Sequence, residues 1–267
     1  MVRGIRDLEA TQRAYAEAEV KKGFECESAK KFADAVVHYR NAAEFGHFGA
    51  HFRLGEMYQA GRGVPQSSQE ASVWLARIRE AAERGDKEAQ VKFGFMYCVG
   101  VGVTRDYAEA VSWWRRADEQ GDAEAAAHLS SAYHWGHGVP EDHEEEERWS
   151  LRAAAQGNPW ACYQLGIRHV GGGKMGPAEL LPEAPPEVHR VFANVQERDI
   201  VCKHEEDLVK AYMWFKLGAM KEGLGQGMCE IWCELIHGGL SASQIAEAER
   251  LAREWEAAVD KASRGKS

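Results

Sequence analysis

The chain has 267 residues, of which 45% are hydrophobic and 28% charged, and its formal net charge at pH 7 is −9. The composition is ordinary for a folded protein, and the charge disfavours nucleic acid and anionic membranes as partners, because both are bound through clustered Lys and Arg. No apolar run is long enough for a membrane-spanning helix, and residues 1–30 contain no signal-peptide core. The six cysteines show no recurring pair, which favours reduced thiols. We therefore expect a cytoplasmic protein.

The first element expected in chain order is a pair of helices over about 11–46. Its residues Gly23, Ala35, Tyr39 and Ala42 have a spacing that resembles a tetratricopeptide unit.

Four similar segments follow, beginning at Ala50, Ala89, Ala125 and Ala161. In each segment an apolar residue stands four positions after the Ala, and a Tyr, or His169 in the last copy, stands eight positions after it. Residues at this spacing share one face of a helix. Five positions after the Ala stands a small residue, Gly in three copies and Ser in one, which would let a neighbouring helix approach closely. A Gly-x-Gly-Val turn ends the first three helices, since glycine tolerates the positive φ of a helix C-cap.

A second helix is expected after each turn, because Trp74, Trp113 and Trp149 recur with small Ala residues around them. The first full copy has three additional residues between Trp74 and Ala81, and they should lengthen or bulge its second helix. We predict helix pairs over about 50–85, 89–121, 125–157 and 161–223.

The last pair contains an insertion over about 171–206. It is interpreted either as a tolerated, mobile insertion or as a lid or docking arm, and a short helix could run from Pro186 to Arg198. Residues 207–223 supply the second helix of the pair, with Ala211 and Trp214 in register. A final helix is expected over 241–262, because Ser241 and Gln244 form a capping box before an apolar stripe.

These motifs resemble the Sel-1-like repeat family, whose pattern is A-x3-L-G-x2-Y-x2-G-x-G-V followed by A-x2-W. Three full copies and two partial ones cover about 11–223, with departures at Ser130, Glu146 and His169. The resemblance implies an all-α fold: a right-handed superhelical α/α solenoid of about five helix pairs over 1–240. The helix over 241–262 is similar to the closing helix of bacterial members and would cap the stack, leaving a tail at 263–267.

No motif of a catalytic or nucleotide site emerges. The glycine-rich turns follow helices and not strands, so they are interpreted as caps, and Gly173–Lys174 lacks the Ser or Thr that would hold magnesium. Four histidines crowd the third copy, but none lies beside a recognisable nucleophile. These are His128, His134, His137 and His143. We predict no catalytic residue, cofactor, metal or small-molecule substrate.

Two further clusters have a structural and a functional interpretation. Cys229, Cys233 and His237 recur at i, i+4 and i+8 and could bind zinc together with Cys202 and His204, but a buried helical stripe has the same spacing and is favoured. The acidic run 141–147 could attract a basic partner, but carboxylates that complement a helix N-terminus are the favoured explanation.

A partner-binding face is predicted on the first helices, which line the concave surface in solenoids of this kind. Its positions differ from copy to copy while the buried stripe repeats, and Phe95, Trp135 and Ile167 would be exposed apolar anchors. The alternative is that these apolar residues pack on neighbouring helices. The predicted site consists of Arg53, Glu56, Lys92, Phe95, His128, Ser131, Trp135, Gln164 and Ile167.

The function implied by the resemblance is that of a non-catalytic scaffold or adaptor for another protein. The first alternative is an immunity-type inhibitor that neutralises a cognate effector enzyme, which the acidic charge would suit. A hydrolase is the second alternative, although no residue supports it.

Overall fold

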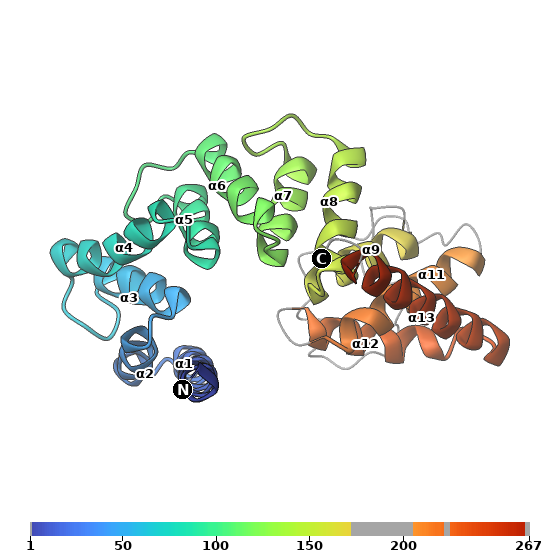
Figure 1. Ribbon diagram of the computed structural model, residues 1–267, viewed down its shortest axis with the longest axis horizontal. Coiled ribbons are helices and arrows are strands. Elements are labelled where there is room, and N and C mark those ends of the chain that lie inside the picture. Colours follow the sequence, from blue (N-terminus) through green and yellow to red (C-terminus); the bar gives the residue numbers. More distant parts are fainter. Residues whose placement is uncertain (1, 172–204, 222–224, 265–267) are drawn as a thin grey trace. The chain divides into compact units, whose positions relative to one another are not determined.

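The computed structural model describes residues 2–171, 205–221 and 225–264, and this part of the chain contains twelve helices and no strand (Figure 1). The chain divides into two compact units, Met1–Ala125 with Gly136–Pro140, and Ala126–Trp135 with Glu141–Ser267. The fold is an all-α repeat, as predicted. The predicted helix from Pro186 to Arg198, with Cys202 and His204, lies outside the described residues.

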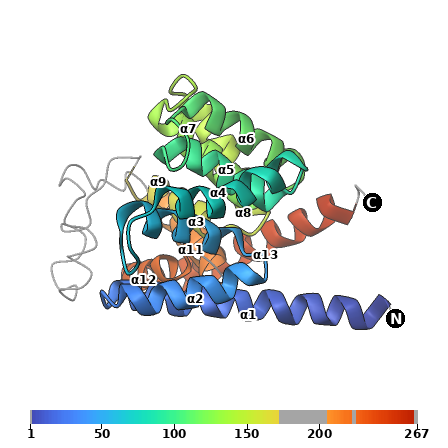
Figure 2. The same ribbon diagram turned by 90° about the vertical axis from the view of Figure 1, so that its left-hand side faces the viewer.

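The first unit is a succession of helix pairs in which each helix packs against the next, and α3 also packs against α5. Figure 2 shows α1 lying beside α2 and extending well beyond it. The helix α1 begins at Val2 and not near residue 11. The prediction began too late because it depended on the repeat motif, which residues 2–10 lack. The helices are α1 (Val2–Ser28), α2 (Phe32–Glu44), α3 (Phe48–Ala60), α4 (Ser68–Glu83), α5 (Lys87–Val99) and α6 (Tyr107–Glu119).

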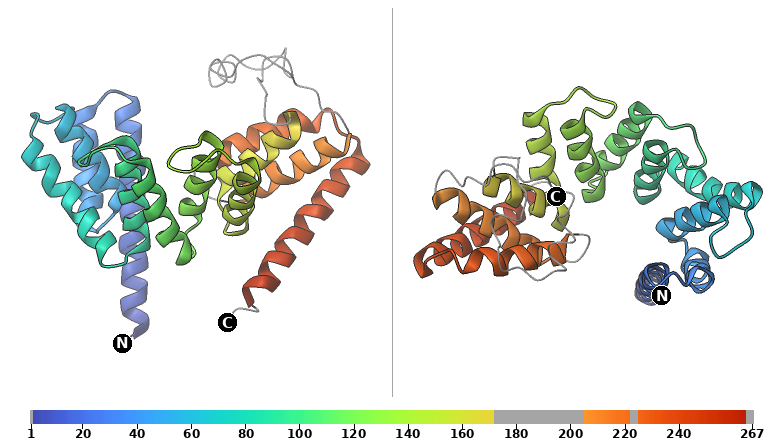
Figure 3. Two further views of the ribbon diagram at one scale, coloured as in Figure 1. Left: turned by 90° about the horizontal axis from the view of Figure 1, so that it is seen from above. Right: turned by 180° about the vertical axis from the view of Figure 1, so that it is seen from behind.

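The second unit is organised around α11, which packs against α9, α12 and α13 (Figure 3). The expected capping box is present at the start of α13: the backbone N–H of Ser241 donates to Gln244 Oε1 at 2.8 Å, and the N–H of Gln244 donates to Ser241 Oγ at 3.4 Å. The helices are α7 (Ala123–Trp135, whose first residues belong to the first unit), α8 (His143–Ala155), α9 (Pro159–Gly171), α11 (Glu205–Ala219), α12 (Gln226–His237) and α13 (Ala242–Arg264).

The glycine-rich turns serve two different purposes. Gly61 adopts the left-handed conformation at the C-cap of α3, and Gly100 does the same for α5. The second glycine of the turn allows a close approach, since a Cβ on Gly63 would overlap the backbone of Phe32. The turns are therefore caps, as predicted, and their second glycine also forms a packing contact. The second helix α4 has 16 residues where α6 and α8 have 13, so the three additional residues lengthen it.

The two helices of each pair meet at the small residue of the first helix. A Cβ placed on Gly55 would lie 2.6 Å from Leu75, and one on Gly94 would lie 2.6 Å from Trp114 Nε1. In the third pair the same contact is polar: buried Ser130 and Ser150 share a hydrogen bond, with 2.7 Å between their hydroxyl oxygens. Glycine on the first helix therefore accommodates a large residue, Leu75 or Trp114, on the second helix. The third pair can carry the larger Ser130 because the residue opposite it, Ser150, is small.

This contact predicts that Gly55→Ala lowers the free energy of unfolding by about 1–3 kcal/mol, because the added methyl group overpacks the interface with Leu75. Urea unfolding followed by circular dichroism measures the change. Gly227→Ala is the matched control, since Gly227 lies in α12 and a Cβ there meets nothing within 4 Å. The control should be neutral or stabilise by up to about 1 kcal/mol. Equal losses in both variants would contradict the close-approach explanation.

Each Trp of the second helices carries an Arg three residues later in the first three copies. The guanidinium carbon of Arg116 lies 4.2 Å from the ring centroid of Trp113, within cation–π range. Arg77 and Arg152 take the same position over Trp74 and Trp149, at 5.5 Å and 5.7 Å. In the fourth copy this position is Leu217, and Trp214 packs instead against Trp255 of α13 at 4.9 Å between ring centroids. In the fourth copy the contact with Trp255 of α13 thus takes the place of the arginine–tryptophan contact.

A polar network joins α1 to α2 around Glu19, which is only 3% exposed. Hydrogen bonds from Lys22, His38 and Asn41 reach its carboxylate at 2.7, 2.9 and 3.0 Å and lower the pKa of Glu19 to about 2. A group whose pKa is lowered by folding stabilises the folded state fully above its unfolded pKa and loses this effect as the pH falls.

We therefore expect the free energy of unfolding to decrease between pH of about 4.5 and about 2, and Glu19→Gln to reduce this pH dependence. Urea titrations across the window measure it. Glu17→Gln, at an exposed position of the same helix, should retain the wild-type profile. Parallel profiles for wild type and Glu19→Gln would show that the network does not hold the ionised carboxylate.

Candidate functional site

Arg53 and Glu56 form a partly shielded charged pair on α3. Arg53 Nη1 donates to Glu56 Oε2 at 3.0 Å, and its guanidinium carbon lies 4.8 Å from the ring centroid of Phe24. Each side chain is about one-third exposed, at 37% and 34%. Burial raises the pKa of Glu56. The pair is held in place by its own contacts and still reaches solvent.

Lys92, the corresponding residue of α5, lies at a charged cavity of about 520 Å³ in the first unit. Its Nζ lies 2.5 Å from Glu124 Oε1, and Arg13 Nη2 lies 3.6 Å from Glu88 Oε2. Burial also raises the pKa of Glu88. The cavity is lined by Arg13, His47, Asp86, Lys87, Glu88, Lys92, Asp122 and Glu124. Both acidic and basic groups therefore line this cavity.

In the second unit, Trp135 at the end of α7 is the exposed member of the predicted set, with 66% of its surface accessible. His128 and Ser131, on the same helix, are partly buried, and Ser131 Oγ donates to the carbonyl of Ala127 at 3.2 Å. Gln164 on α9 has a buried Oε1 with no hydrogen-bond donor.

Phe95 and Ile167 differ from the expectation of exposed anchors. Phe95 is partly buried, and its ring meets that of Phe52 edge-on, with the centroids 5.3 Å apart. Ile167 packs against the hydrophobic core of the second unit. Their positions face the neighbouring helices because α3 and α5 pack side by side, and α9 packs against three helices of its unit. For these two residues the alternative interpretation describes the structure better.

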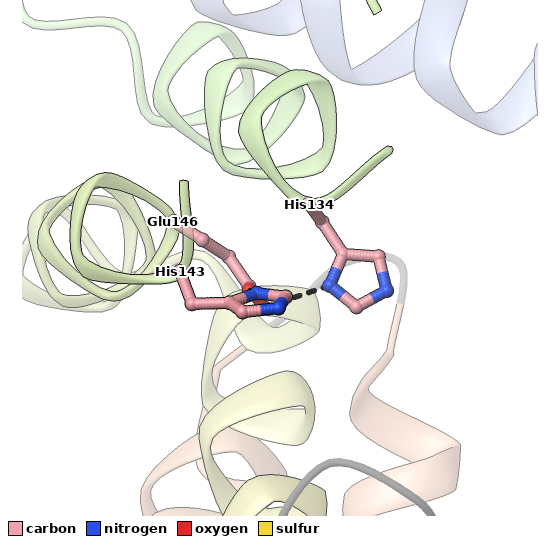
Figure 4. Close-up of side chains that lie close together, drawn as sticks. All are labelled: His134, His143 and Glu146. Carbon is pink, nitrogen blue, oxygen red and sulfur yellow. Dashed lines mark hydrogen bonds and ion pairs between the residues drawn. The ribbon is translucent and has the colours of Figure 1, made fainter. Parts of the chain in front are cut away.

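Sequence reasoning missed a cluster formed by His134, His143 and Glu146, whose ligand-type atoms all lie within 4.8 Å of one another (Figure 4). His134 comes from the last turn of α7, and the other two lie one turn apart at the start of α8. The spacing of His143 and Glu146 could have indicated a shared helical face. The proximity of His134 depends on how α7 and α8 pack, which no local motif encodes.

The acidic run starts α8, as expected. Asp142 is its N-cap and accepts the backbone N–H groups of Glu144 and Glu145 at 2.9 and 3.0 Å. Three glutamates occupy the first turn, where carboxylates complement the helix dipole.

Cys229 and Cys233 lie on the side of α12 that packs into the core, whereas His237 is exposed and its Nδ1 lies 3.3 Å from the Tyr212 hydroxyl oxygen. Cys229 is fully buried, and its thiol lies 3.6 Å from the carbonyl oxygen of Pro159. Burial raises the pKa of Cys229, and that of Cys233 to about 11. The two cysteines therefore belong to the hydrophobic core of the second unit, whereas His237 does not. The five cysteines among the described residues are free.

Paired helices that recur with the same small-residue contact define an α/α helical-repeat protein. The chain belongs to the Sel1 repeat family: the model of the Sel1 repeat matches residues 49–86, 87–122, 123–158 and 203–222. Proteins of this family are generally scaffolds for protein–protein interaction and typically non-catalytic. Within the described residues, no helix is both long and apolar enough to cross a membrane.

Several solved structures are similar to this chain. A protective antigen of uropathogenic Escherichia coli with an SLR fold shares 27% identity over 94% of this chain and 48% of its own, with a TM-score of 0.46, so this chain spans about half the length of that protein. A Sel1 repeat protein from Oxalobacter formigenes shares 22% identity over 77% of this chain and 86% of its own, with a TM-score of 0.43. An immunity protein from Pseudomonas aeruginosa shares 19% identity over 67% of this chain and 80% of its own, with a TM-score of 0.35. A search of curated proteins gave no match.

Proposed function

We propose that this chain is a non-catalytic scaffold that binds another protein in the cytoplasm through the variable residues of its first helices. The observation that carries the proposal is the contrast between two sets of positions on these helices. The stripe residues Ala50, Ala89, Ala125 and Ala161 are fully buried and identical. The residues three positions later are Arg53, Lys92, His128 and Gln164, which differ in charge and are only partly buried.

The chemistry of these positions favours a partner surface that carries both charges and an apolar contact. Arg53, Glu56 and Lys92 keep access to solvent while ion pairs limit their movement, which reduces the entropy lost on binding. Trp135 offers a large exposed ring, and tryptophan is enriched among the residues that dominate binding energy. We further propose that residues 1–240 act as one solenoid closed by the helix over 241–262.

The proposal predicts that Trp135→Ala weakens partner binding by about 2 kcal/mol or more, the loss typical of a hot-spot residue. Affinity capture with quantitative mass spectrometry first identifies the proteins retained by the wild-type chain, and calorimetry with the purified partner then measures the affinity. Met220→Ala is the matched control, because Met220 is 60% exposed and lies just after the second helix α11. Identical capture profiles and affinities for wild type and Trp135→Ala would refute a role for this face.

An inhibitor of a basic effector enzyme is the second candidate, favoured by the net charge of −9. Acidic surfaces accelerate association with basic partners in a salt-dependent manner. A toxin-like enzyme encoded by a neighbouring gene, bound tightly and inhibited by this chain, would support the candidate. A captured partner whose activity is unchanged by saturating chain would leave the general scaffold as the function.

A further inference from the structure

We propose that His134, His143 and Glu146 form a binding site for a divalent transition metal ion, with zinc as the best-fitting ion (Figure 4). His134 Nδ1 lies 3.1 Å from Glu146 Oε1, and His143 Nδ1 lies 3.0 Å from Glu146 Oε2. Ligand atoms of a tetrahedral zinc ion, each about 2.0–2.1 Å from the metal, are separated by about 3.3 Å. Small side-chain rotations therefore bring two nitrogens and one oxygen to a common centre.

The donor set favours zinc and its neighbours over calcium or magnesium. Imidazole nitrogen is a ligand of transition metals, whereas calcium and magnesium take oxygen ligands almost exclusively. Two histidines with one glutamate form a recognised zinc set that leaves the fourth position to water. The site is accessible to an ion, since His143 is 60% exposed while Glu146 is held at 16%.

An unsatisfied atom in the cluster points to a missing ligand. His134 Nδ1 is buried, and although Glu146 Oε1 lies nearby, the two do not form a hydrogen bond of acceptable geometry. A metal ion between these atoms would satisfy both.

The surrounding residues orient the three ligands. Glu141 Oε1 lies 3.3 Å from His143 Nε2, the nitrogen left free when Nδ1 faces the ion, and such carboxylates fix the ring of a metal-bound histidine. Arg168 lies 3.7 Å from Glu146 Oε2 and 3.5 Å from Glu147 Oε2, on the oxygen of Glu146 that does not face His134. The arginine therefore holds the carboxylate in place and leaves Oε1 available.

The test titrates zinc chloride into the full chain, freed of any histidine tag and treated with a chelator, and follows binding by calorimetry. We expect one equivalent to bind. His134→Ala and His143→Ala should each weaken affinity by more than about 100-fold, because even outer-shell changes cost about 10–100-fold. Glu141→Gln should weaken it by about 10-fold. Cobalt(II) in place of zinc should give a spectrum of nitrogen and oxygen ligation without a thiolate band.

Matched controls separate the site from non-specific binding. His137→Ala changes a histidine of the same segment whose ring stacks on Tyr107, and Glu144→Gln changes an exposed carboxylate of the same helical turn as Glu146. Both should keep wild-type affinity, while Glu146→Gln should lose it. Circular dichroism checks that every variant is folded. The proposal is overturned if the wild-type chain binds no zinc, if both histidine variants bind it as tightly as the wild type, or if the cobalt spectrum shows thiolate ligation.

Discussion

Phe215→Ala is expected to lower the free energy of unfolding by about 3–5 kcal/mol, as large truncations in a packed core do. Phe215 is fully buried on α11, and its ring stacks on Trp232 of α12 with the centroids 5.3 Å apart. A Cβ on Gly166 of α9 would overlap the same ring. One side chain therefore fills the space between three helices, and its removal leaves a cavity that none of them can close alone.

The change is measured from the midpoint and slope of urea unfolding, followed by circular dichroism. Met220→Ala, at an exposed position just after α11, is the control and should stay within about 0.5 kcal/mol of the wild type. A loss below about 1 kcal/mol for Phe215→Ala would mean that α9, α11 and α12 do not share this core.

Ser150→Leu is expected to destabilise the chain by about 2–6 kcal/mol. The larger side chain overpacks the contact with Ser130 by about 1–3 kcal/mol, and the buried Ser130 hydroxyl loses its partner at a further cost of about 1–3 kcal/mol. Both serines are nearly inaccessible, at 1% and 3% exposure, so neither can turn towards water. Urea unfolding of the single variant measures the sum of the two effects.

The double variant Ser130→Gly with Ser150→Leu tests the cause. It recreates the glycine–leucine contact of Gly55 with Leu75, so most of the loss should be recovered and the two substitutions should couple by about 1–3 kcal/mol. Additive losses would show that the third pair is not built on the same contact as the first full copy.

The repeat could be predicted from the sequence because its signals are local. Ala50, Leu54 and Tyr58 recur on one helical face and are buried in the structure, and the glycines that follow adopt the positive φ expected of caps. Ser130 and Ser150 also carried a signal, since both depart from the pattern in the same copy. The start of α1 could not be predicted, because Val2 to Ala10 contain no repeat residue and helix extension there depends only on weak propensity.

The candidate sites were less predictable, because they depend on contacts between helices. Whether Phe95 is exposed is decided by Phe52 on the neighbouring α3, and the face of α5 alone does not reveal that contact. His134 and Glu146 stand twelve positions apart and meet only because α7 and α8 form a pair. The i, i+3 spacing within α8 identifies His143 and Glu146, but it cannot identify His134, which lies on α7.

The contact between Trp214 and Trp255 bears on which repeats of this chain could be duplicated. In an internal repeat the tryptophan ring is covered by an arginine of its own helix, so we expect that duplication of residues 87–122 would add a compatible module. The last module has Leu217 in place of that arginine, and the ring of its Trp214 packs against Trp255 of α13. We expect lengthening by duplication to be tolerated at the internal modules, whereas a copy of the last module would compete with α13 for the ring of Trp214.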